Sequence, residues 1–331
     1  MSRRVDLFYH GFEVQALDQP LGRLQSHARL ALRTAYRTLR GRQPYTGFYT
    51  AFRSLKEGLE SVGVDVHVND FAYARRHPDQ PIGVIGHDGV LDRVDLRNPA
   101  VFGPGHIGPP REFAASLKGR NVRVIVGASQ WPCDMLRPRL QRNVQPLFAP
   151  ISLAKWPDLS GHAKTCDVVI YDKIHWNRGE MVPRIRDRLR RHLDDRGLSH
   201  VVLRYGEHTL SQYRAALASG RTLAFLSAHE TQGIAYQEAL ASGLPVFAWD
   251  EGKLIDPEDV RTAPANLVVS SVPYFDERCG VTFTEPQLEA RFDRFWAARD
   301  GFAPRDYVAE NLSPEKSARM YLDLLDQAAA S

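Results

Sequence analysis

Two carboxylates eight residues apart, Glu230 and Glu238, flank a turn that contains Gly233. An apolar run at 223–226 precedes this turn, and a second apolar run at 245–248 follows it. Because glycine relaxes the backbone of a turn, we expect a buried strand, a polar loop, a short helix and a second buried strand. The first N–H groups of such a helix have no intrahelical partner and carry partial positive charge. Backbone donors for phosphate beside carboxylates for hydroxyl groups suit a sugar nucleotide.

The segment 225–249 resembles the Glu-x7-Glu signature of retaining glycosyltransferases of family 4. The family pattern runs approximately Ser-x-x-Glu-x-x-Gly-x-x-x-x-Glu-Ala-x-Ala-x-Gly-x-Pro-Val, and its places are occupied here by Ser227, Glu230, Gly233, Glu238, Ala239, Ala241, Gly243, Pro245 and Val246. The resemblance implies an α/β protein of the GT-B fold, with two facing Rossmann-like domains, each with a mostly parallel sheet. In that fold a C-terminal helix crosses back to the first domain. The implied activity is a retaining, hexosyltransferase-type transfer from a nucleotide diphosphate sugar to a glycan, lipid or small-molecule acceptor.

The resemblance also implies roles for the residues of this motif. Glu230 would be catalytic and would lie against the transferred sugar near its anomeric carbon, as a nucleophile or as a positioning group. Glu238 would bind the ribose hydroxyls of the donor nucleotide. The turn at Gly233 and Ile234 would bind the donor diphosphate. The residues alone leave an alternative, because acidic side chains stabilise a helix N-terminus by about 0.3–1 kcal/mol with no ligand present.

Two basic residues, Lys173 and Arg178, follow the apolar run at 168–171. The resembled family places an Arg here and a Lys-Gly pair five residues later, both on the donor diphosphate. This chain has the reverse order, with Gly179 after Arg178, and both side chains still deliver a permanent cation to a phosphate. A solvated pair of loop cations is the alternative. The chain contains no Asp-x-Asp sequence, so we expect these cations and helix N–H groups, with no metal and no cofactor, to meet the donor charge.

Further candidates lie in the first half of the chain. His106 stands in a glycine-rich segment after an apolar run, where the resembled family often carries a His that touches the donor sugar, and it is the second catalytic candidate. His87 competes for this role, because it also follows an apolar run. Tyr45 and Gly47 open a predicted helix at the place of the family's glycine loop. They are predicted to contact the donor or the acceptor, with an ordinary turn as the alternative.

Short apolar runs alternate with helical patterns along the whole chain, which is typical of parallel α/β architecture. The predicted strands are 5–9, 64–68, 82–85, 100–102 and 122–126 in the first half, and 168–171, 201–204, 223–226, 245–248 and 267–269 in the second. We predict an N-terminal acceptor-side domain over 1–150, a linker over 151–162, a C-terminal nucleotide-sugar domain over 163–310, and a terminal helix over 311–331 that packs on the first domain.

Composition narrows the class of protein. The chain has 331 residues and 43% hydrophobic content, which is enough for two cores. Its three cysteines lie far apart, with neither disulfide nor zinc spacing, and this favours a reducing cytoplasm. The sequence holds no apolar run close to the roughly 20 residues of a membrane span.

The net charge is +4, and a basic, helix-like insertion at about 20–42 concentrates arginines. Such a helix could lie on an anionic membrane surface, so peripheral contact with the inner face of a membrane is one expectation and a solvated helix packed by a narrow apolar stripe is the other. Nucleic acid is not expected, because aromatic residues are not interleaved with the basic ones. Two rival functions stay open: a sugar-nucleotide epimerase or phosphorylase on the same scaffold, and a non-catalytic basic module for polyanions or RNA.

Overall fold

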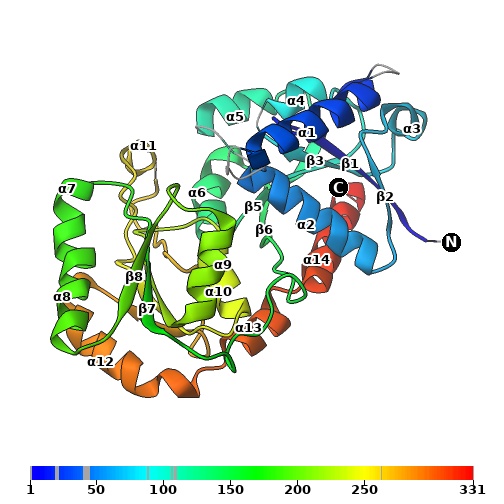
Figure 1. Cartoon of the computed structure of the whole chain (residues 1–331). Helices are drawn as coiled ribbons and strands as arrows, with labels where there is room; N and C mark the ends of the chain where they lie inside the picture. The colour runs from blue at the N-terminus through cyan, green and yellow to red at the C-terminus, as the bar shows by residue number, and fades with distance from the viewer. Residues whose placement is uncertain are drawn as a thin grey trace. The chain divides into compact units, whose positions relative to one another are not determined.

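The computed structural model describes residues 2–18, 22–39, 45–87, 89–105, 107, 110–261 and 263–330. The chain divides into two compact units. The first unit contains Met1–Pro150 together with Pro314–Ser331, and the second contains Ile151–Ser313. Each unit is built around one parallel β-sheet with helices on both faces (Figure 1).

The sheet of the first unit has six strands in the order β2-β1-β3-β4-β5-β6. These strands are β1 (Arg4–His10), β2 (Asp65–Val68), β3 (Ile82–Gly86), β4 (Ala100–Gly105), β5 (Val122–Gly127) and β6 (Asn143–Pro146). All five strand pairs are parallel. The chain passes from β1 to β2 on one side and then to β3 on the other, so the strand order reverses between β1 and β3.

Helices cover both faces of this first sheet: α1 (Gly22–Leu39), α2 (Gly47–Ser61), α3 (Phe71–Arg76), α4 (Val90–Arg93), α5 (Pro110–Ser116), α6 (Gln130–Leu140) and α14 (Pro314–Ala330). Leu7 and Phe8 are consecutive in β1 and therefore point to opposite faces. The core around Leu7 is completed by apolar side chains of α2 and α14. The core around Phe8 is completed by α3, α4, α5 and α6.

The C-terminal helix returns to the first unit, as the resemblance implied. It packs against α2 at Gly58, where an added Cβ would lie 2.8 Å from the backbone oxygen of Pro314. A glycine at this position therefore permits the close approach of the two helices.

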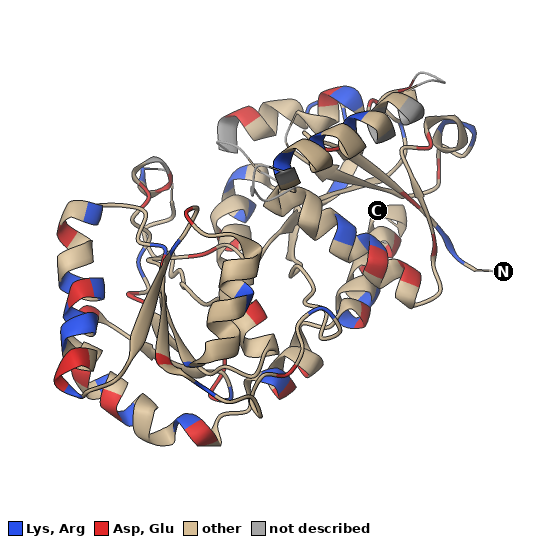
Figure 2. Cartoon of the chain, viewed as in Figure 1, with Lys and Arg blue, Asp and Glu red and all other residues tan. Residues whose placement is uncertain are grey.

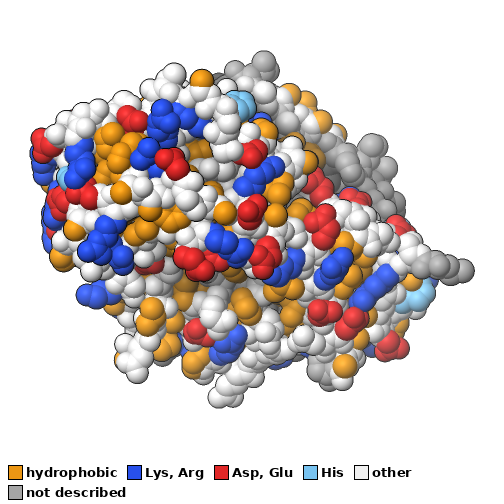
Figure 3. Space-filling view, turned by 90° about the horizontal axis from the view of Figure 1, so that it is seen from below, with side chains coloured by type: hydrophobic (Ala, Val, Ile, Leu, Met, Phe, Trp, Pro, Cys, Tyr) orange, Lys and Arg blue, Asp and Glu red, His pale blue; other side chains and the backbone are white. Residues whose placement is uncertain are grey.

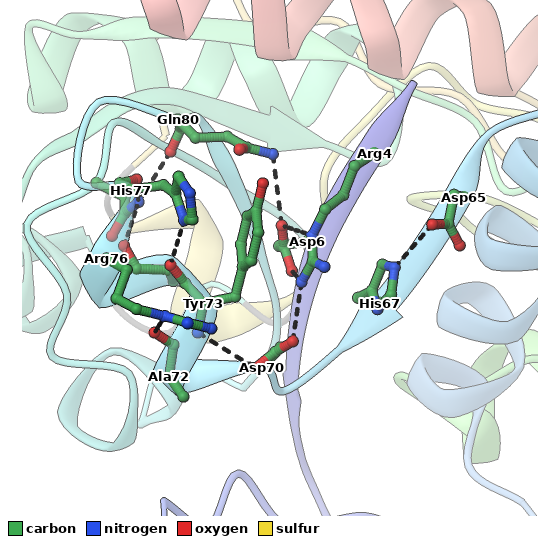
Figure 4. Close-up of polar contacts among 12 residues, drawn as sticks. Arg4, Asp6, Asp65, His67, Asp70, Ala72, Tyr73, Arg76, His77 and Gln80 are labelled. Carbon is green, nitrogen blue, oxygen red and sulfur yellow. Dashed lines mark hydrogen bonds and ion pairs between the residues drawn. The ribbon is translucent and has the colours of Figure 1, made fainter. Parts of the chain in front are cut away.

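The start of β1 is fixed by ion pairs. The guanidinium of Arg4 lies 2.6 Å from the buried carboxylate of Asp6 and 2.9 Å from Asp70, and it covers the ring of Tyr73 at 3.4 Å (Figure 4). Asp70 also caps α3, because its side chain accepts a hydrogen bond from the backbone N–H of Tyr73. These contacts stabilise the N-terminal end of β1, and none of them involves its carboxyl end.

The sheet of the second unit has five strands in the order β11-β10-β9-β7-β8, all parallel. They are β7 (Cys166–Asp172), β8 (His200–Arg204), β9 (Gly220–Leu226), β10 (Val246–Trp249) and β11 (Gly280–Phe283). The chain leaves β7 for β8 on one side and returns to β9 on the other. The strand order therefore reverses between β7 and β9.

The helices of the second unit are α7 (Arg178–Met181), α8 (Asp187–Asp195), α9 (Leu210–Ser219), α10 (Ile234–Ala241), α11 (Pro257–Val260), α12 (Leu288–Ala298) and α13 (Pro304–Asn311), with a π-helical turn at Val182–Arg186. One face of the sheet packs against α8 and α12 around Phe247 and Phe292. On the other face, Phe225 stacks with Tyr171 and contacts Tyr236 of α10.

The outward faces of these helices are charged. Basic and acidic residues alternate along α7 and α8 (Figure 2), and Arg188 of α8 pairs with Glu289 of α12 at 2.5 Å. Basic, acidic and apolar side chains are also interspersed on the face seen in Figure 3. Among the described residues, no helix has the length and apolar content needed to cross a membrane.

The predicted strands agree with the structure except at three places. The predicted strand at 267–269 is wrong, because this segment adopts no strand and Val268 is 74% exposed. The fifth strand of the second unit is β11, whose first residue, Gly280, has a φ of +139°. A Cβ there would lie 2.0 Å from the backbone oxygen of Val246, so glycine lets β11 approach β10. Strand β6 was also not predicted, and Val144 is the only one of its four side chains that is fully buried.

Candidate functional site

The reversal between β7 and β9 places two loops side by side at the carboxyl ends of the strands. Lys173 begins the loop after β7, and its backbone N–H donates to the backbone oxygen of Leu226, the last residue of β9, at 2.9 Å. In open parallel sheets, ligands bind in the crevice outside the carboxyl ends at such a reversal. The fold alone therefore selects these loops, and both carry predicted site residues.

The two loops are joined by an ion pair. The Nζ of Lys173 lies 2.7 Å from Oε1 and 2.8 Å from Oε2 of Glu230. The hydroxyl of Ser227 donates to Oε1 of the same carboxylate at 2.8 Å, and the backbone N–H of Glu230 donates to the oxygen of Ser270 at 3.0 Å. Glu230 is 8% exposed, so its carboxylate is held from several sides. Lys173 also lies 4.6 Å from the centre of the Tyr205 ring, a cation–π contact that adds to its fixation.

The turn after Glu230 ends at the N-terminus of α10. Gly233 caps this helix with a left-handed backbone at φ 77°, and no side chain caps it. A Cβ at Gly233 would lie 2.1 Å from the ring of Tyr236. The side-chain amide of Gln237 donates to the backbone oxygen of Gln232 at 2.8 Å and closes the turn. Ile234 is the first residue of α10, so its N–H belongs to the positive end of the helix.

Glu238 lies one turn further along α10. Burial raises the pKa of its carboxyl to about 8, and the nearby guanidinium of Arg214 opposes this shift only in part. Glu238 as a whole residue is partly exposed, although its carboxyl group is buried. At pH 7 this carboxyl is mostly protonated, and it can donate one hydrogen bond as well as accept others.

Arg178 is engaged inside the protein. Its guanidinium forms two hydrogen bonds of 2.9 Å to the two oxygens of Asp172, which is fully buried at the end of β7. Arg186 donates to the same carboxylate at 3.0 Å, as does the backbone N–H of Ile174 at 3.1 Å. Burial would raise the pKa of Asp172, but the hydrogen bonds from Arg178, Ile174 and Arg186 outweigh it and hold the pKa below its usual value.

Two side chains near the pair were not among the main candidates from sequence. Trp176 stacks on His229, with ring centroids 4.4 Å apart and an interplanar angle of 25°. Burial lowers the pKa of His229 to about 4, although Asp256 acts in the opposite direction. His229 is therefore neutral near pH 7. Asp172 was missed too, and its signal in the sequence is an acidic residue placed directly after a buried apolar run.

The described first-unit candidates lie at the start of α2 and after β3, and the ring of Phe48, next to Gly47, lies 5.0 Å from that of His87. His87 follows β3 and is half-buried. Gly47 is the exposed first residue of α2, and Tyr45 precedes this helix with the Arg53 guanidinium 5.2 Å from its ring centre. His106 lies outside the described residues. The structure thus brings Lys173 to Glu230, and it joins Gly233, Ile234 and Glu238 through α10. Within the described part of the chain, no group of three His, Cys, Asp or Glu side chains is arranged to hold a metal ion.

Solved structures of other proteins have the same fold as this chain. No family model and no curated protein matches the chain. Sucrose-phosphate synthase from Thermosynechococcus elongatus is similar at a TM-score of 0.51 and 14% identity, over 99% of this chain and 100% of that one. The pneumococcal O-GlcNAc transferase GtfA, solved with UDP and GlcNAc, is similar at a TM-score of 0.51 and 10% identity, over 78% of this chain and 60% of that chain. Similarity at these identities concerns the fold, and the chain shares with these proteins the two Rossmann-like domains of the GT-B fold.

Proposed function

We propose that this chain is a retaining glycosyltransferase that moves a sugar from a nucleotide diphosphate sugar to a carbohydrate or glycoconjugate acceptor. The observation that carries the proposal is the Lys173–Glu230 pair, 2.7 Å apart at the reversal between β7 and β9. A fixed cation, a fixed carboxylate and a helix N-terminus with no side-chain cap meet at the place where this type of sheet binds ligands. The GT-B fold of the structural neighbours agrees with such a role, as an argument from analogy.

The donor would be held by three groups of the second unit. Lys173 has three N–H donors, so it can keep Glu230 and still donate to a phosphate oxygen. The N–H groups of Gly233 and Ile234 would donate hydrogen bonds to the other diphosphate oxygens at the start of α10. The carboxyl of Glu238, which both donates and accepts when protonated, would bind the two ribose hydroxyls.

Arg178 has a different position in this proposal. Its charge is already matched by Asp172 at 2.9 Å. Leaving the buried carboxylate without this partner is costly, because an uncompensated buried charge is strongly destabilising. We therefore assign the main diphosphate contact to Lys173. Arg178 would support it by holding the strand end in place, and its direct contact with phosphate stays a prediction.

The chemistry follows from where charge develops. When the bond between the anomeric carbon and the diphosphate breaks, negative charge builds on the leaving phosphate oxygen. Lys173 and the α10 N–H groups are already fixed at this place, so they stabilise the transition state more than the ground state. The acceptor hydroxyl would attack the anomeric carbon from the side of the leaving group, and the phosphate oxygen would take its proton. Glu230 would orient the sugar hydroxyls. His106 stays a candidate for a further sugar contact, and no divalent metal is required.

A thermal-shift screen against UDP-, GDP-, ADP- and dTDP-sugars tests donor binding. A ligand at 100-fold excess over its Kd stabilises a protein by about 2.7 kcal/mol. We expect one nucleotide class to raise the melting temperature of the wild type, and the rise to disappear in folded Lys173→Ala and Glu238→Ala proteins. Lys56→Ala is the matched control, because Lys56 also pairs with a glutamate but lies on α2 of the first unit. A full shift in Lys173→Ala would refute the proposed site.

Two further assays separate the rival functions. A product formed from the sugar nucleotide in the absence of any sugar acceptor would identify an epimerase, and one that requires inorganic phosphate would identify a phosphorylase. Binding to RNA that falls steeply with salt and survives Glu238→Ala would identify a polyanion-binding module. The proposed transferase instead requires both donor and acceptor, and its product keeps the anomeric configuration of the donor.

A further inference from the structure

The first unit has its own strand reversal, between β1 and β3, and a cavity lies at the carboxyl ends of these two strands. The cavity has a volume of about 620 Å³, within the range of small-molecule sites. His10 ends β1 and His87 follows β3, and both line the cavity. Arg29 from α1 and Arg93 from α4 line it too. In the second unit, the proposed donor site lies at the strand reversal. In the first unit, an open cavity lies at the same kind of reversal.

Glycines bring the strand ends close together beneath this cavity. Gly86, the last residue of β3, has a φ of +134°, and a Cβ there would lie 2.4 Å from the backbone oxygen of His10. A Cβ at Gly105, the last residue of β4, would lie 2.2 Å from the backbone oxygen of Gly86. Any other residue at either position would displace backbone, so the sequence keeps the strand ends packed and fixes the position of His10.

Among the described residues of the lining, arginines outnumber carboxylates. Within the described part of the chain, neither Arg29 nor Arg93 forms an ion pair with a carboxylate. Asp92 is the acidic residue among the described residues of the lining, and it pairs with Arg120 at 2.8 Å. The two arginines therefore carry charge that no described carboxylate compensates, on the walls of a cavity open to solvent.

The lining is also biased toward hydrogen-bond donors. The Nδ1 of His10 accepts a hydrogen bond from the backbone N–H of Ala16 at 3.1 Å. In the neutral ring the proton is then on Nε2, which is a donor. Burial lowers the pKa of His10, and the charges of Arg93 and Arg29, which line the same cavity, lower it further. Arginine has donors only, so the cavity favours a ligand that accepts, such as an anion.

An aromatic side chain lies at the edge of the cavity. Phe12 lines the cavity and is 56% exposed, and its ring meets that of His87 edge-on at 6.0 Å. The guanidinium of Arg33 lies over this ring, 5.6 Å from its centre. The aromatic surface that stays exposed beside donor groups suits a molecule with a charged end and a less polar body. A saccharide that carries an anionic group is such a molecule, because the face of its sugar ring is less polar than that group.

We propose that this cavity binds the phosphate or carboxylate of an anionic saccharide, and that the acceptor of the transfer reaction is such a saccharide. The identification as acceptor rests on the proposed function, whereas anion binding rests on the cavity alone. The inference explains the insertion at 20–42 as the segment that supplies Arg29. The same phosphate chemistry is present in a free sugar phosphate and in a phosphorylated lipid headgroup.

Calorimetry with inorganic phosphate, glucose 6-phosphate and glucose at constant ionic strength tests anion binding. We expect glucose 6-phosphate to bind more tightly than glucose by at least about tenfold, and the Arg29→Ala/Arg93→Ala double variant to lose this difference. Both arginines are exposed, so the double variant should fold, and its melting temperature checks this. A protein with Arg93→Lys in place of Arg93→Ala should regain part of the binding that the double variant loses. Arg97→Ala is the matched control, because Arg97 is an exposed arginine just after α4 that does not line the cavity. Equal binding by wild type and double variant would overturn the proposal.

The controls separate this site from the donor site. Phosphate that binds at the donor site would be lost in Lys173→Ala and kept in the double variant. If no nucleotide binds but glucose 6-phosphate still depends on Arg29 and Arg93, the proposed function fails and the anion site stands. If nucleotide binds normally and anion binding does not depend on Arg29 or Arg93, the anion site fails and the proposed function stands. Vesicles of phosphatidylcholine with phosphatidic acid identify the source: Arg29- and Arg93-dependent binding that glucose 6-phosphate displaces assigns the phosphate to a lipid headgroup, and absence of binding assigns it to a soluble saccharide.

Discussion

Replacement of Glu238 by glutamine tests whether burial in the second unit keeps this carboxyl protonated. Burial raises its pKa to about 8 from a usual 4.5. Glutamine has the shape of the protonated acid and cannot ionise. The substitution should therefore leave the packing of α10 intact and remove one specific pH dependence.

The size and sign of that dependence follow from the two pKa values. They differ by about 3.5 pH units, which at about 1.36 kcal/mol per unit gives a full effect on the order of 5 kcal/mol. The folded state holds the proton more tightly than the unfolded chain. The stabilisation is therefore complete below pH 4.5 and is lost as the pH rises through 8. Between pH 5 and pH 8, the free energy of unfolding of the wild type should fall by about 3 kcal/mol relative to Glu238→Gln.

Urea denaturation at pH 5, 6, 7 and 8 measures this difference. Tryptophan fluorescence reports mainly on the second unit, because it contains Trp156, Trp176, Trp249 and Trp296 and only Trp131 lies in the first. Groups such as His229 titrate equally in both proteins, so the difference between the two curves isolates the carboxyl. Parallel curves for wild type and Glu238→Gln from pH 5 to pH 8 would refute the reasoning.

Two other substitutions test the frame of the site. Gly233→Ala should destabilise the second unit by about 1–3 kcal/mol and abolish the nucleotide thermal shift, because a Cβ would strike the ring of Tyr236 and φ is positive. Gly179→Ala is the control and should change neither quantity, because a Cβ there meets no described atom within 4 Å. Equal effects of the two substitutions would refute this role of Gly233. Asp172→Asn should cost on the order of 3 kcal/mol, because it leaves Arg178 without a charged partner. The pKa of Asp172 is lowered in the folded state, so its contribution to the free energy of unfolding is present above about pH 4 and is lost below it. Acid unfolding followed by circular dichroism should therefore show a shallower loss of stability in Asp172→Asn than in the wild type. The same loss of stability in both proteins would exclude this role.

The sequence predicts most of the fold, because each central strand is a short apolar run between helical patterns. Strand β1 and strand β9 illustrate this, since buried side chains fill nearly their whole length. Strand β11 was missed because its assignment depends on a contact that only the folded chain makes: Gly280 against the oxygen of Val246. The segment 267–269, in which Val268 is exposed and Val269 is buried, has the same local character as a strand and lacks a partner strand in the described structure.

The candidate site was predictable in part. The Glu-x7-Glu spacing locates the turn at Gly233, since the pattern is local in sequence. The pairing of Arg178 with Asp172 was not predictable, because a basic residue after a strand looks the same whether it meets a phosphate or a buried carboxylate. The cavity with Arg29 and Arg93 joins segments far apart in the chain, and no local pattern reports that proximity.

In the proposed reaction, the loops that follow β7 and β9 hold the nucleotide diphosphate of the donor. A crystal structure of the chain with the nucleotide sugar that gives the largest thermal stabilisation tests it most directly. We expect the diphosphate within hydrogen-bond distance of Lys173 Nζ and the N–H of Ile234, and the ribose hydroxyls on Glu238. A nucleotide bound elsewhere, or no nucleotide at these loops at saturating ligand, would refute the assignment.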